Sequence, residues 1–450
     1  MSLSVLILAA GQGTRLKSSR TKMLHPLGGR PILDYALQVA QALTDHKPTV
    51  VVGRDSDAVR EWAGERAEYV IQAEQLGTGH AVLQARPALQ GGCERVLVML
   101  ADMPLIRIDS ARALVAAHQR QRGPLSILTV LAPNQKDFGR IVRDSQGNVA
   151  AIVEAAHATP EQLALTEKNS GLFCLNADWL WEHLPHLPLS PKGEYYLTDL
   201  VALAVAEGAP VSAHTIDDET EIIGVNTRAQ LAEAEAALRK RINAHWLSEG
   251  VTLIDPATTY IEATVTIGRD TMIWPNTHLQ GQTVIGPDCI IGPNTIIRDT
   301  TMGHQCEIES SVLEGAWLAD HVDVGPFAHL RKGARLETGV HIGNFGEIKN
   351  ATLGPGAKMG HFSYIGDATL GADVNIGAGT ITCNYDGVNK HHTIIGDGVF
   401  VGSDTMLVAP ITLGPKARTG AGAVVTKDIP ADALAVGMPA RVIRKLKSTD

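Results

Sequence analysis

The stretch TVIGPDCIIGPNTIIRD, residues 283–299, repeats with a period of six and decides the fold of half of this 450-residue chain. Ile285, Ile291 and Ile297 occupy the same position in three consecutive hexapeptides. A period of six matches neither an α-helix nor a simple strand, and it is typical of β-solenoids in which each hexapeptide forms one flat side of a coil. We therefore predict a left-handed parallel β-helix with three sides to a coil.

The same period runs through most of the C-terminal half in three phases. Its aliphatic positions are Ile261, Ile267, Ile273, Leu279, Ile285, Ile291 and Ile297, then Leu318, Val324, Leu330, Leu336, Ile342 and Ile348, then Ile395, Val401, Leu407 and Leu413. The period breaks near residues 300–315, 350–370 and 382–393, and the last break inserts TCNYDGVNKHHT. Loops that leave a rigid scaffold often carry function, so this insertion is a candidate binding segment.

The N-terminal half has a different pattern. Short apolar runs such as SVLILAA, TVVVG, RVLVML and SILTVL alternate with amphipathic stretches such as ILDYALQVAQAL and DSARALVAAHQRQ. This alternation predicts an α/β domain with a parallel sheet. We assign residues 1–226 to this domain, 227–250 to a connecting helix, 251–437 to the β-helix and 438–450 to a C-terminal tail.

A glycine turn follows the first apolar run, in LILAAGQGTRL, residues 6–16. It lacks the third glycine of a dinucleotide fingerprint and the Gly-Lys-Ser/Thr of a Walker loop. Its backbone N–H groups can still approach a phosphate, which Arg15, one turn into the following helix, can grip. The alternative is a tight turn between strand and helix with a solvated arginine.

Composition narrows the classes of function. The net charge of −9 argues against nucleic-acid binding, and the five cysteines are scattered without a C-x-x-C pair, so no zinc knuckle or disulfide framework is indicated. No stretch of eighteen uncharged apolar residues occurs, and the first residues do not form a signal peptide. We expect no transmembrane segment and a cytoplasmic location.

Motifs along nearly the whole chain resemble the bacterial bifunctional N-acetylglucosamine-1-phosphate uridylyltransferase and glucosamine-1-phosphate N-acetyltransferase family. In the first domain they are LAAGQGTRL, TKMLHPL, QAEQLGTGHA, ADMPL, FGRI, NSG, GEYYLTD and GVN. In the second they are GPFAHLRKGA, HIGNFGEIK, GHFSYIGDA and NIGAGTITCNYDGVNKHHT. The resemblance implies a Rossmann-like nucleotidyltransferase domain before the β-helix, and a role in UDP-N-acetylglucosamine synthesis for the cell wall.

For the first domain the resemblance implies a site for UTP, N-acetylglucosamine-1-phosphate and Mg²⁺. Its implied contacts to UTP are Ala9, Ala10, Gly11, Gly13, Gln72, Gly77 and Thr78, with Gln72 and the Gly77–Thr78 turn reading uracil. Arg15 and Lys22 are the implied catalytic cations on the phosphates, and the implied sugar contacts are Gly139, Glu154 and Asn169. Asp102 and Asn226 are the implied Mg²⁺ ligands, although each alone reads as a turn residue. Nucleotidyl transfer is an in-line displacement that needs positioning and charge neutralisation, which suits this set.

For the second domain the resemblance implies acetyl transfer from acetyl-CoA, with His361 as the base. A histidine has the ordinary pKa for that task, but His361 alone also reads as a structural corner residue. The implied contacts to glucosamine-1-phosphate are Arg331, Lys349, Tyr364, Asn375 and Lys390. Those to acetyl-CoA are Ala378, Asn384, Tyr385, Ser403, Ala421 and Arg441. A homotrimer is implied, with acetyl sites built between subunits.

Three departures from the family pattern leave alternatives open. Leu100-Ala101 replaces Tyr-Gly before the metal aspartate, Thr21 replaces a proline, and Met438 stands where the family has an arginine that contacts CoA. Leucine at position 100 lacks the hydroxyl of the family's tyrosine. We expect the methyl group of Ala101 to narrow the space beside the sugar. One alternative is therefore a related enzyme with another sugar or nucleotide. The other is a β-helix that serves only as a trimerisation or regulatory module.

Overall fold

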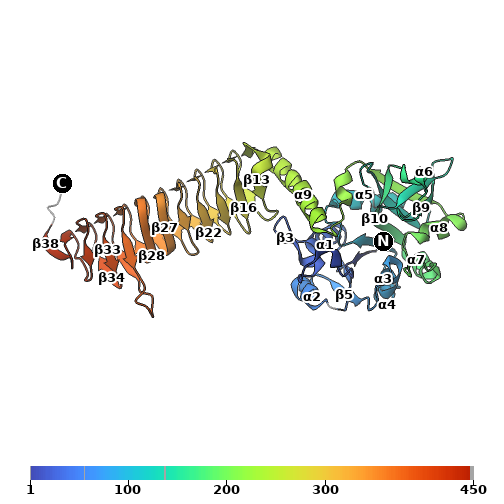
Figure 1. Cartoon of the computed structure of the whole chain (residues 1–450), viewed down its shortest axis with the longest axis horizontal. Coiled ribbons are helices and arrows are strands. Elements are labelled where there is room, and N and C mark those ends of the chain that lie inside the picture. The colour runs from blue at the N-terminus through green and yellow to red at the C-terminus, as the bar shows by residue number, and fades with distance from the viewer. Residues whose placement is uncertain (1, 55, 136–137, 446–450) are drawn as a thin grey trace. The chain divides into compact units, whose positions relative to one another are not determined.

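The computed structural model describes residues 2–54, 56–135 and 138–445, and the chain forms two compact units, Met1–Leu238 and Arg239–Asp450 (Figure 1). The division falls within α9 (Arg228–Ser248), which occupies the segment expected to be a connecting helix. Among the described residues, no helix has the length and apolar character needed to cross a membrane.

The first unit is built on a sheet with strand order β11-β7-β10-β6-β1-β4-β5, and β8 and β9 form a hairpin that branches from β10. The strands are β1 (Leu3–Leu8), β4 (Thr49–Val52), β5 (Glu68–Ile71), β6 (Arg95–Leu100), β7 (Leu125–Leu131), β8 (Arg140–Arg143), β9 (Val149–Val153), β10 (Glu167–Asn176) and β11 (Val211–Ile216), with a separate small pair, β2 (Pro26–Leu27) and β3 (Arg30–Pro31). The helices are α1 (Ile32–Leu43), α2 (Asp57–Ala63), α3 (Thr78–Gln84), α4 (Arg86–Leu89), α5 (Ile108–Arg120), α6 (Pro160–Leu163), α7 (Ala177–His183) and α8 (Asp199–Ala206).

The expectation of a wholly parallel sheet is wrong for one central strand. β10 runs antiparallel to both of its neighbours, β6 and β7, while the remaining neighbours in the strand order are parallel. The chain reaches β10 through the β8–β9 hairpin and the short α6, without the long crossover helix that a parallel connection requires. The sheet is therefore mixed.

Helices cover both faces of this sheet, as the continuous apolar run of β1 predicts. Leu6 and Leu8 belong to the core on one face, together with residues of α3, α7 and α8. Val5 and Ile7 belong to the core on the other face, together with residues of α1 and α5. The carboxyl ends of β1 and β6 are left open, where ligands of α/β sheets usually bind.

The second unit is the predicted left-handed parallel β-helix. Its strands run from β12 (Thr252–Leu253) to β37 (Ala433–Val436), and most of them pair in parallel with the strand three places later, as β16 (Thr277–Gln280) does with β19 (Ile296–Arg298). The aliphatic residues of the period stack in its interior, where Leu279, Ile297 and Ile348 have no exposed surface. The two longest strands are β27 (His341–Leu353) and β28 (Lys358–Leu370), which continue around the corners of their coils.

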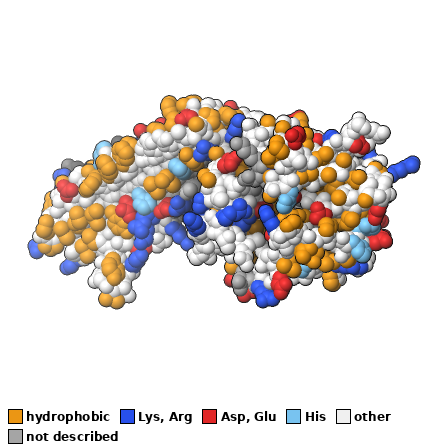
Figure 2. All heavy atoms as spheres, turned by 45° about the vertical axis from the view of Figure 1, so that its right-hand side comes forward, with side chains coloured by type: hydrophobic (Ala, Val, Ile, Leu, Met, Phe, Trp, Pro, Cys, Tyr) orange, Lys and Arg blue, Asp and Glu red, His pale blue; other side chains and the backbone are white. Residues whose placement is uncertain are grey.

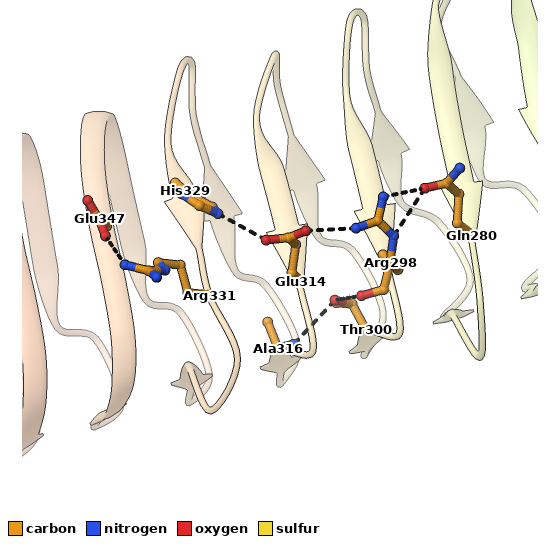
Figure 3. Close-up of polar contacts among 8 residues, drawn as sticks. All are labelled: Gln280, Arg298, Thr300, Glu314, Ala316, His329, Arg331 and Glu347. Atoms are coloured by element: carbon orange, nitrogen blue, oxygen red, sulfur yellow. Dashed lines mark hydrogen bonds and ion pairs between the residues drawn. The ribbon is translucent and has the colours of Figure 1, made fainter.

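Corners of the β-helix are held by backbone conformation and by side chains. Asp288, Asn294 and Asp299 have positive φ angles of 59°, 53° and 48°, a region in which Asn and Asp are enriched. The Thr300 hydroxyl donates to the Arg298 carbonyl at 3.0 Å and accepts from the Ala316 N–H at 3.3 Å (Figure 3). Such bonds satisfy the polar groups that a sharp turn leaves buried.

Breaks in the period correspond to changes in coil length. Ile297 pairs with Leu313, whereas an unbroken period would pair it with Gly315. The insertion at 382–393 leaves the helix between β30 (Ile381–Cys383) and β31 (Thr393–Ile395). At the C-terminus, residues expected in a tail form β38 (Arg441–Lys445), which pairs antiparallel with β37.

Candidate active sites

A cavity of about 430 Å³ in the first unit lies at the carboxyl ends of β1 and β6. It is lined by nine of the residues expected to bind nucleotide or metal: Ala10, Gly11, Arg15, Lys22, Gln72, Gly77, Thr78, Asp102 and Asn226. Ala9 does not line the cavity, because its side chain is buried in the core beside α1. Gln75, Met23, Glu194 and Tyr196 also line it and were not expected there.

The glycine turn differs in one respect from the expectation. Gly13 has a φ of 65°, and a Cβ there would lie 2.6 Å from Cβ of Lys22, so only glycine fits without displacing that lysine. The turn is followed by a single 3₁₀ turn, Thr14–Leu16, and not by an α-helix, because Lys17 adopts a left-handed conformation. Arg15 therefore sits on a short turn with its side chain exposed at the cavity.

Lys22 connects the two residues expected to bind metal. Its Nζ lies 2.7 Å from Oδ2 of Asp102 and 2.7 Å from Oδ1 of Asn226, and its side chain is 5% exposed. Two oxygen donors thus converge on one position that a cation occupies. Such donors suit Mg²⁺, which uses few protein ligands and keeps water and phosphate oxygens.

The expected uracil end of the cavity is preorganised by the turn before α3. The buried Gln72 amide donates to the Gly77 carbonyl at 3.1 Å. Gly77 has a φ of 96°, and a Cβ there would lie 2.5 Å from the carbonyl oxygen of Tyr195. The Thr78 hydroxyl accepts from the Leu197 N–H at 3.0 Å. These contacts fix the turn before any ligand arrives.

A second cavity of about 250 Å³ adjoins the first, and the two share Thr78, Leu100 and Tyr196. All three expected sugar contacts line it, namely Gly139, Glu154 and Asn169. It is also lined by residues that the sequence reasoning did not single out: Met103, Phe138, Gly171, Phe173, Tyr196, Leu197 and Thr198. Tyr196 and Thr198 lie in the GEYYLTD motif, which was the available signal.

Hydrogen bonds orient the polar side chains of this second cavity. Burial raises the pKa of Glu154, and the Thr198 hydroxyl, which donates to Oε1 of Glu154 at 3.2 Å, opposes that shift. Oδ1 of Asn169 accepts from the Gly171 N–H at 3.0 Å, so its amide nitrogen is left to donate to a ligand. The cavity therefore offers one carboxylate acceptor and one amide donor.

The departures at residues 100 and 101 have different consequences. Leu100 lines both cavities, and its Cδ1 lies 2.6 Å from where a Cβ of Gly171 would be. Ala101 is fully buried in the core beside α1 and lines neither cavity. The expectation that its methyl narrows the space beside the sugar is therefore wrong. At Thr21, φ is −54°, close to the value that a proline would hold.

In the second unit, His361 lies in a column of residues at one corner of the β-helix. This first corner comprises residues 325–328, 343–346, 360–363, 377–380, 402–405 and 420–423. Asn344 pairs with His361, and the amide oxygen of Asn344 is 2.9 Å from Nδ1 of His361. A proton on Nδ1 satisfies this contact and leaves the lone pair of Nε2 free, which is the form that a base needs.

The same corner holds three of the residues expected to bind acetyl-CoA. The Ala378 carbonyl accepts from the Asp404 N–H of the next coil, and the Ser403 carbonyl accepts from the Gly422 N–H of the coil after it. Ala378, Ser403 and Ala421 thus follow His361 coil by coil. Asn375 lies on β29 (Asn375–Ile376), directly before this corner.

The expected phosphate contacts gather at a second corner, which comprises residues 331–333, 349–351, 366–368 and 383–392. The neighbouring Lys390 and Arg331 lower the pKa of Lys349, so three cations lie close together. Nη1 of Arg331 is 2.9 Å from Oε1 of Glu347, and a separate series of polar contacts on the preceding coils connects Gln280, Arg298, Glu314 and His329 (Figure 3). The cluster of Arg331, Lys349 and Lys390 can bind a phosphate.

The inserted segment shapes this second corner. Asn384 is 8% exposed and donates from Nδ2 to Asp367, so its amide supports the corner. Burial opposes ionisation of Asp367, but hydrogen bonds from Asn350 and Asn384 lower its pKa. Tyr385 is 61% exposed, and its backbone pairs with that of Lys390 in an isolated antiparallel β-bridge. Its ring is therefore available to a ligand.

One chain does not bring the two groups of acetyl-site residues together. His361 lies at the first corner, and Lys349 and Lys390 lie at the second. The side of the coil that contains Tyr364 and Ile365 separates them. Arg441 lies on β38, with its side chain exposed. Within one chain, therefore, the cation cluster and His361 do not lie where both could contact the same substrate molecule.

Three segments match known families. Residues 5–166 match the MobA-like NTP transferase domain, residues 264–299 match the bacterial transferase hexapeptide of six repeats, and residues 392–427 match the hexapeptide repeat of succinyl-transferase. The nucleotide cavity lies mainly within the first match, as does half of the lining of the sugar cavity. The third match begins where the insertion ends and covers most of the coils after it.

Similar proteins cover the full length of the chain. It is 46% identical to the "Bifunctional protein GlmU" of Pelobacter propionicus, over 99% of this chain and 97% of the relative. It is 46% identical to the protein of that name from Trichlorobacter lovleyi, over 98% and 96% respectively. The identity is 47% for the protein of that name from Heliobacterium modesticaldum, over 96% of this chain and 95% of the relative.

Proposed function

The chain belongs to the GlmU family of bifunctional acetyltransferases and uridylyltransferases, and from that premise we propose how its residues divide the two reactions. The first unit transfers the uridylyl group of UTP to N-acetylglucosamine-1-phosphate and releases pyrophosphate. The second unit first makes that acceptor, by acetyl transfer from acetyl-CoA to glucosamine-1-phosphate. The observation that carries the proposal is the Lys22 ammonium between Asp102 and Asn226, beside two adjoining cavities.

In the uridylyl reaction the residues of the first unit position the two substrates and neutralise the charge of their phosphates. Gln72 and the Gly77–Thr78 turn hold the uracil, and Glu154, Asn169 and Gly139 hold the sugar. Arg15 and Lys22 bind the phosphates, so that the sugar-phosphate oxygen faces the α-phosphorus in line with the leaving pyrophosphate. Asp102 and Asn226 would hold Mg²⁺, which when bound neutralises phosphate charge.

In the acetyl reaction His361 accepts the proton that the attacking amine loses. Backbone N–H groups near Ala378, Ser403 and Ala421 stabilise the oxyanion that forms on the thioester carbonyl. Arg331, Lys349 and Lys390 bind the sugar phosphate. We place these reactions in the cytoplasm.

We propose a homotrimer in which the first corner of one subunit meets the second corner of another. The separation of His361 from the cation cluster supports this arrangement. Three exposed rings on the first corner also support it: Phe327, Phe345 and Phe362 are 60%, 54% and 70% exposed, and adjacent ring centroids are 5.6 and 6.3 Å apart. Hydrophobic side chains are prominent on the surface of the coils (Figure 2). Apolar surface of this kind marks an interface.

A substrate panel tests the chemistry. UTP and dTTP are each offered with N-acetylglucosamine-1-phosphate and glucose-1-phosphate, and acetyl-CoA is offered with glucosamine-1-phosphate. We expect pyrophosphate release to be fastest with UTP and the acetylated sugar, and acetyl transfer to glucosamine-1-phosphate. A preference for dTTP or another sugar would favour the related-enzyme alternative, and absence of acetyl transfer would favour a β-helix that only assembles the protein.

Mixing two inactive variants tests the shared acetyl site. His361→Ala lacks the base, and Lys349→Ala lacks part of the phosphate cluster. After subunit exchange at equal amounts, about one quarter of the native acetyl-transfer activity should return, because each of the two chains at a site is the competent one half of the time. No recovery in mixed trimers would place both groups of residues in the same chain.

A further inference from the structure

A third cavity in the first unit, of about 790 Å³, adjoins the sugar cavity and has no role in the reactions above. It shares Glu154 and Tyr196 with the sugar cavity. The cationic side chains that line it include Arg140 and Lys168. Arg140 is 3% exposed and Lys168 is 2% exposed, so both cations are almost fully withdrawn from water.

The sheet places these two cations side by side. Lys168 on β10 is directly opposite Arg140 on β8, in an antiparallel pair, so both side chains project from the same face. Asn169, the next residue on β10, projects to the opposite face and lines the sugar cavity. Like charges directly opposite each other destabilise a sheet, and burial increases the cost.

Neither cation has an acidic partner among the residues that the structure describes. Nη1 of Arg140 donates to the Phe138 carbonyl at 2.6 Å, and Nζ of Lys168 donates to the Leu165 carbonyl. Nε of Arg140 is buried without any hydrogen-bond partner. Burial and the Arg140 charge lower the pKa of Lys168. Two like charges therefore lie side by side, and one of them has a buried N–H without a partner. A bound anion would neutralise the charges and accept from that N–H.

The rest of the cavity lining agrees with that requirement. His157 and Lys192 stand exposed at the rim. Glu154 is the single acidic residue among the described lining residues, and its side chain accepts from Thr198. The lining is therefore positive on balance, with its most buried charges at the strands β8 and β10.

We propose that Arg140 and Lys168 form a binding subsite for an oxyanion, a phosphate or a carboxylate, next to the acceptor sugar. Two sources could supply this chemistry: a second anionic substituent on the sugar-1-phosphate, remote from C1, or a free anion such as inorganic phosphate. The first source rests on the proposed uridylyltransferase function. The second does not, because binding of a free anion requires no turnover.

The variant that tests the subsite is Lys168→Met, which keeps the length of the side chain and removes its charge. The matched control is Lys47→Met, at an exposed lysine elsewhere in the same unit. Binding of inorganic phosphate is measured by titration calorimetry and by thermal denaturation of the full chain. UTP and glucosamine-1-phosphate are both saturating, so that the nucleotide cavity and the phosphate cluster of the second unit are filled. Ionic strength is matched with chloride.

We expect phosphate to bind the native chain and Lys47→Met equally, and to bind Lys168→Met at least tenfold more weakly. Without phosphate, Lys168→Met should unfold at the same temperature as the native chain or a higher one, because a buried unpaired charge is gone. Equal phosphate affinity in all three chains would overturn the proposal. So would a large loss of thermal stability in Lys168→Met together with no phosphate binding by the native chain, since Lys168 would then be only a structural donor to Leu165.

A kinetic comparison separates the two sources. The ratio of kcat/KM for glucose-1,6-bisphosphate over glucose-1-phosphate is measured in the native chain and in Lys168→Met. If the sugar carries the anion, this ratio should fall at least tenfold in the variant. An unchanged ratio with loss of phosphate binding assigns the subsite to a free anion. If uridylyl transfer is absent in every chain, the proposed function fails, while the calorimetry still decides the subsite.

Discussion

Leu100 forms part of the wall between the nucleotide and sugar cavities. Its side chain packs over Gly171 and lines both cavities, where the family pattern has a tyrosine hydroxyl. A hydroxyl at this position can contact the acceptor sugar, and one such hydrogen bond is worth about 1 kcal/mol. The native chain should therefore discriminate weakly between acceptor sugars.

The first prediction follows from that wall. Leu100→Tyr should raise the ratio of kcat/KM for N-acetylglucosamine-1-phosphate over glucose-1-phosphate by about fivefold, the equivalent of about 1 kcal/mol. The control is Ala101→Gly, whose side chain lies in the core, and it should leave the ratio unchanged. If Ala101→Gly changes the ratio and Leu100→Tyr does not, the assignment of the wall is wrong.

Glu154 should make acceptor binding sensitive to mild acid. Burial raises its pKa above the ordinary value of 4.5. As the pH falls through the raised pKa, the carboxylate is protonated and becomes a weaker acceptor for the sugar that it is proposed to hold. We predict that kcat/KM for the acceptor falls at a higher pH than an ordinary glutamate would give, a profile that reports the free enzyme.

The matched variant is Glu154→Gln, which should have a lower kcat/KM at neutral pH and no decline over that range of acid pH. The pH dependence of stability runs in the opposite direction: because the raised pKa favours the protonated form in the fold, the contribution of Glu154 to stability is present at low pH and is lost as the pH rises through that pKa. A decline that persists in Glu154→Gln would assign the titration to another group.

The coils of the β-helix are stabilised by their interior columns. Ile348 has no exposed surface and stacks between Leu330 and Ile365 of the adjacent coils. We predict that Ile348→Ala lowers the free energy of unfolding by about 2–5 kcal/mol, because the removed methyl groups leave a cavity. The measurement is urea denaturation of the full chain.

An exposed isoleucine of the same sheet supplies the control. Ile394 lies on β31 and is 47% exposed. Ile394→Ala should change the free energy of unfolding by no more than about 0.5 kcal/mol. Equal losses in the two variants would mean that stability does not follow the interior columns.

The two units should lose their activities independently. Asp102, the proposed Mg²⁺ ligand of the uridylyl site, lies in the first unit, and His361, the proposed base of the acetyl site, lies in the second. We predict that Asp102→Ala abolishes Mg²⁺-dependent pyrophosphate release and leaves acetyl transfer near the native rate. His361→Ala should lower acetyl transfer by about 10²–10⁴-fold, the usual contribution of a general base, and leave uridylyl transfer intact. Loss of both activities in a folded single variant would contradict two separate sites.

Residue patterns within short segments determined much of the fold of each unit. The six-residue period specifies which side chains enter the β-helix interior, since one hexapeptide forms one side of a coil. The apolar runs and glycine turns likewise indicate the strands and the loop at Gly13. Most of the residues that the family resemblance implies for the first domain line the nucleotide and sugar cavities, including Glu154 and Asn169.

Other features depend on residues that are distant in sequence, and only the folded chain decides them. Lys22 meets Asp102 and Asn226 across separations of 80 and 204 residues. The direction of β10, the burial of Ala101 and the pairing of Arg140 with Lys168 all follow from the path of the chain between strands. A local pattern specifies which face a side chain takes along its own strand. It does not specify the neighbouring strand, and so it does not determine the contacts that set charge and shape in the cavities.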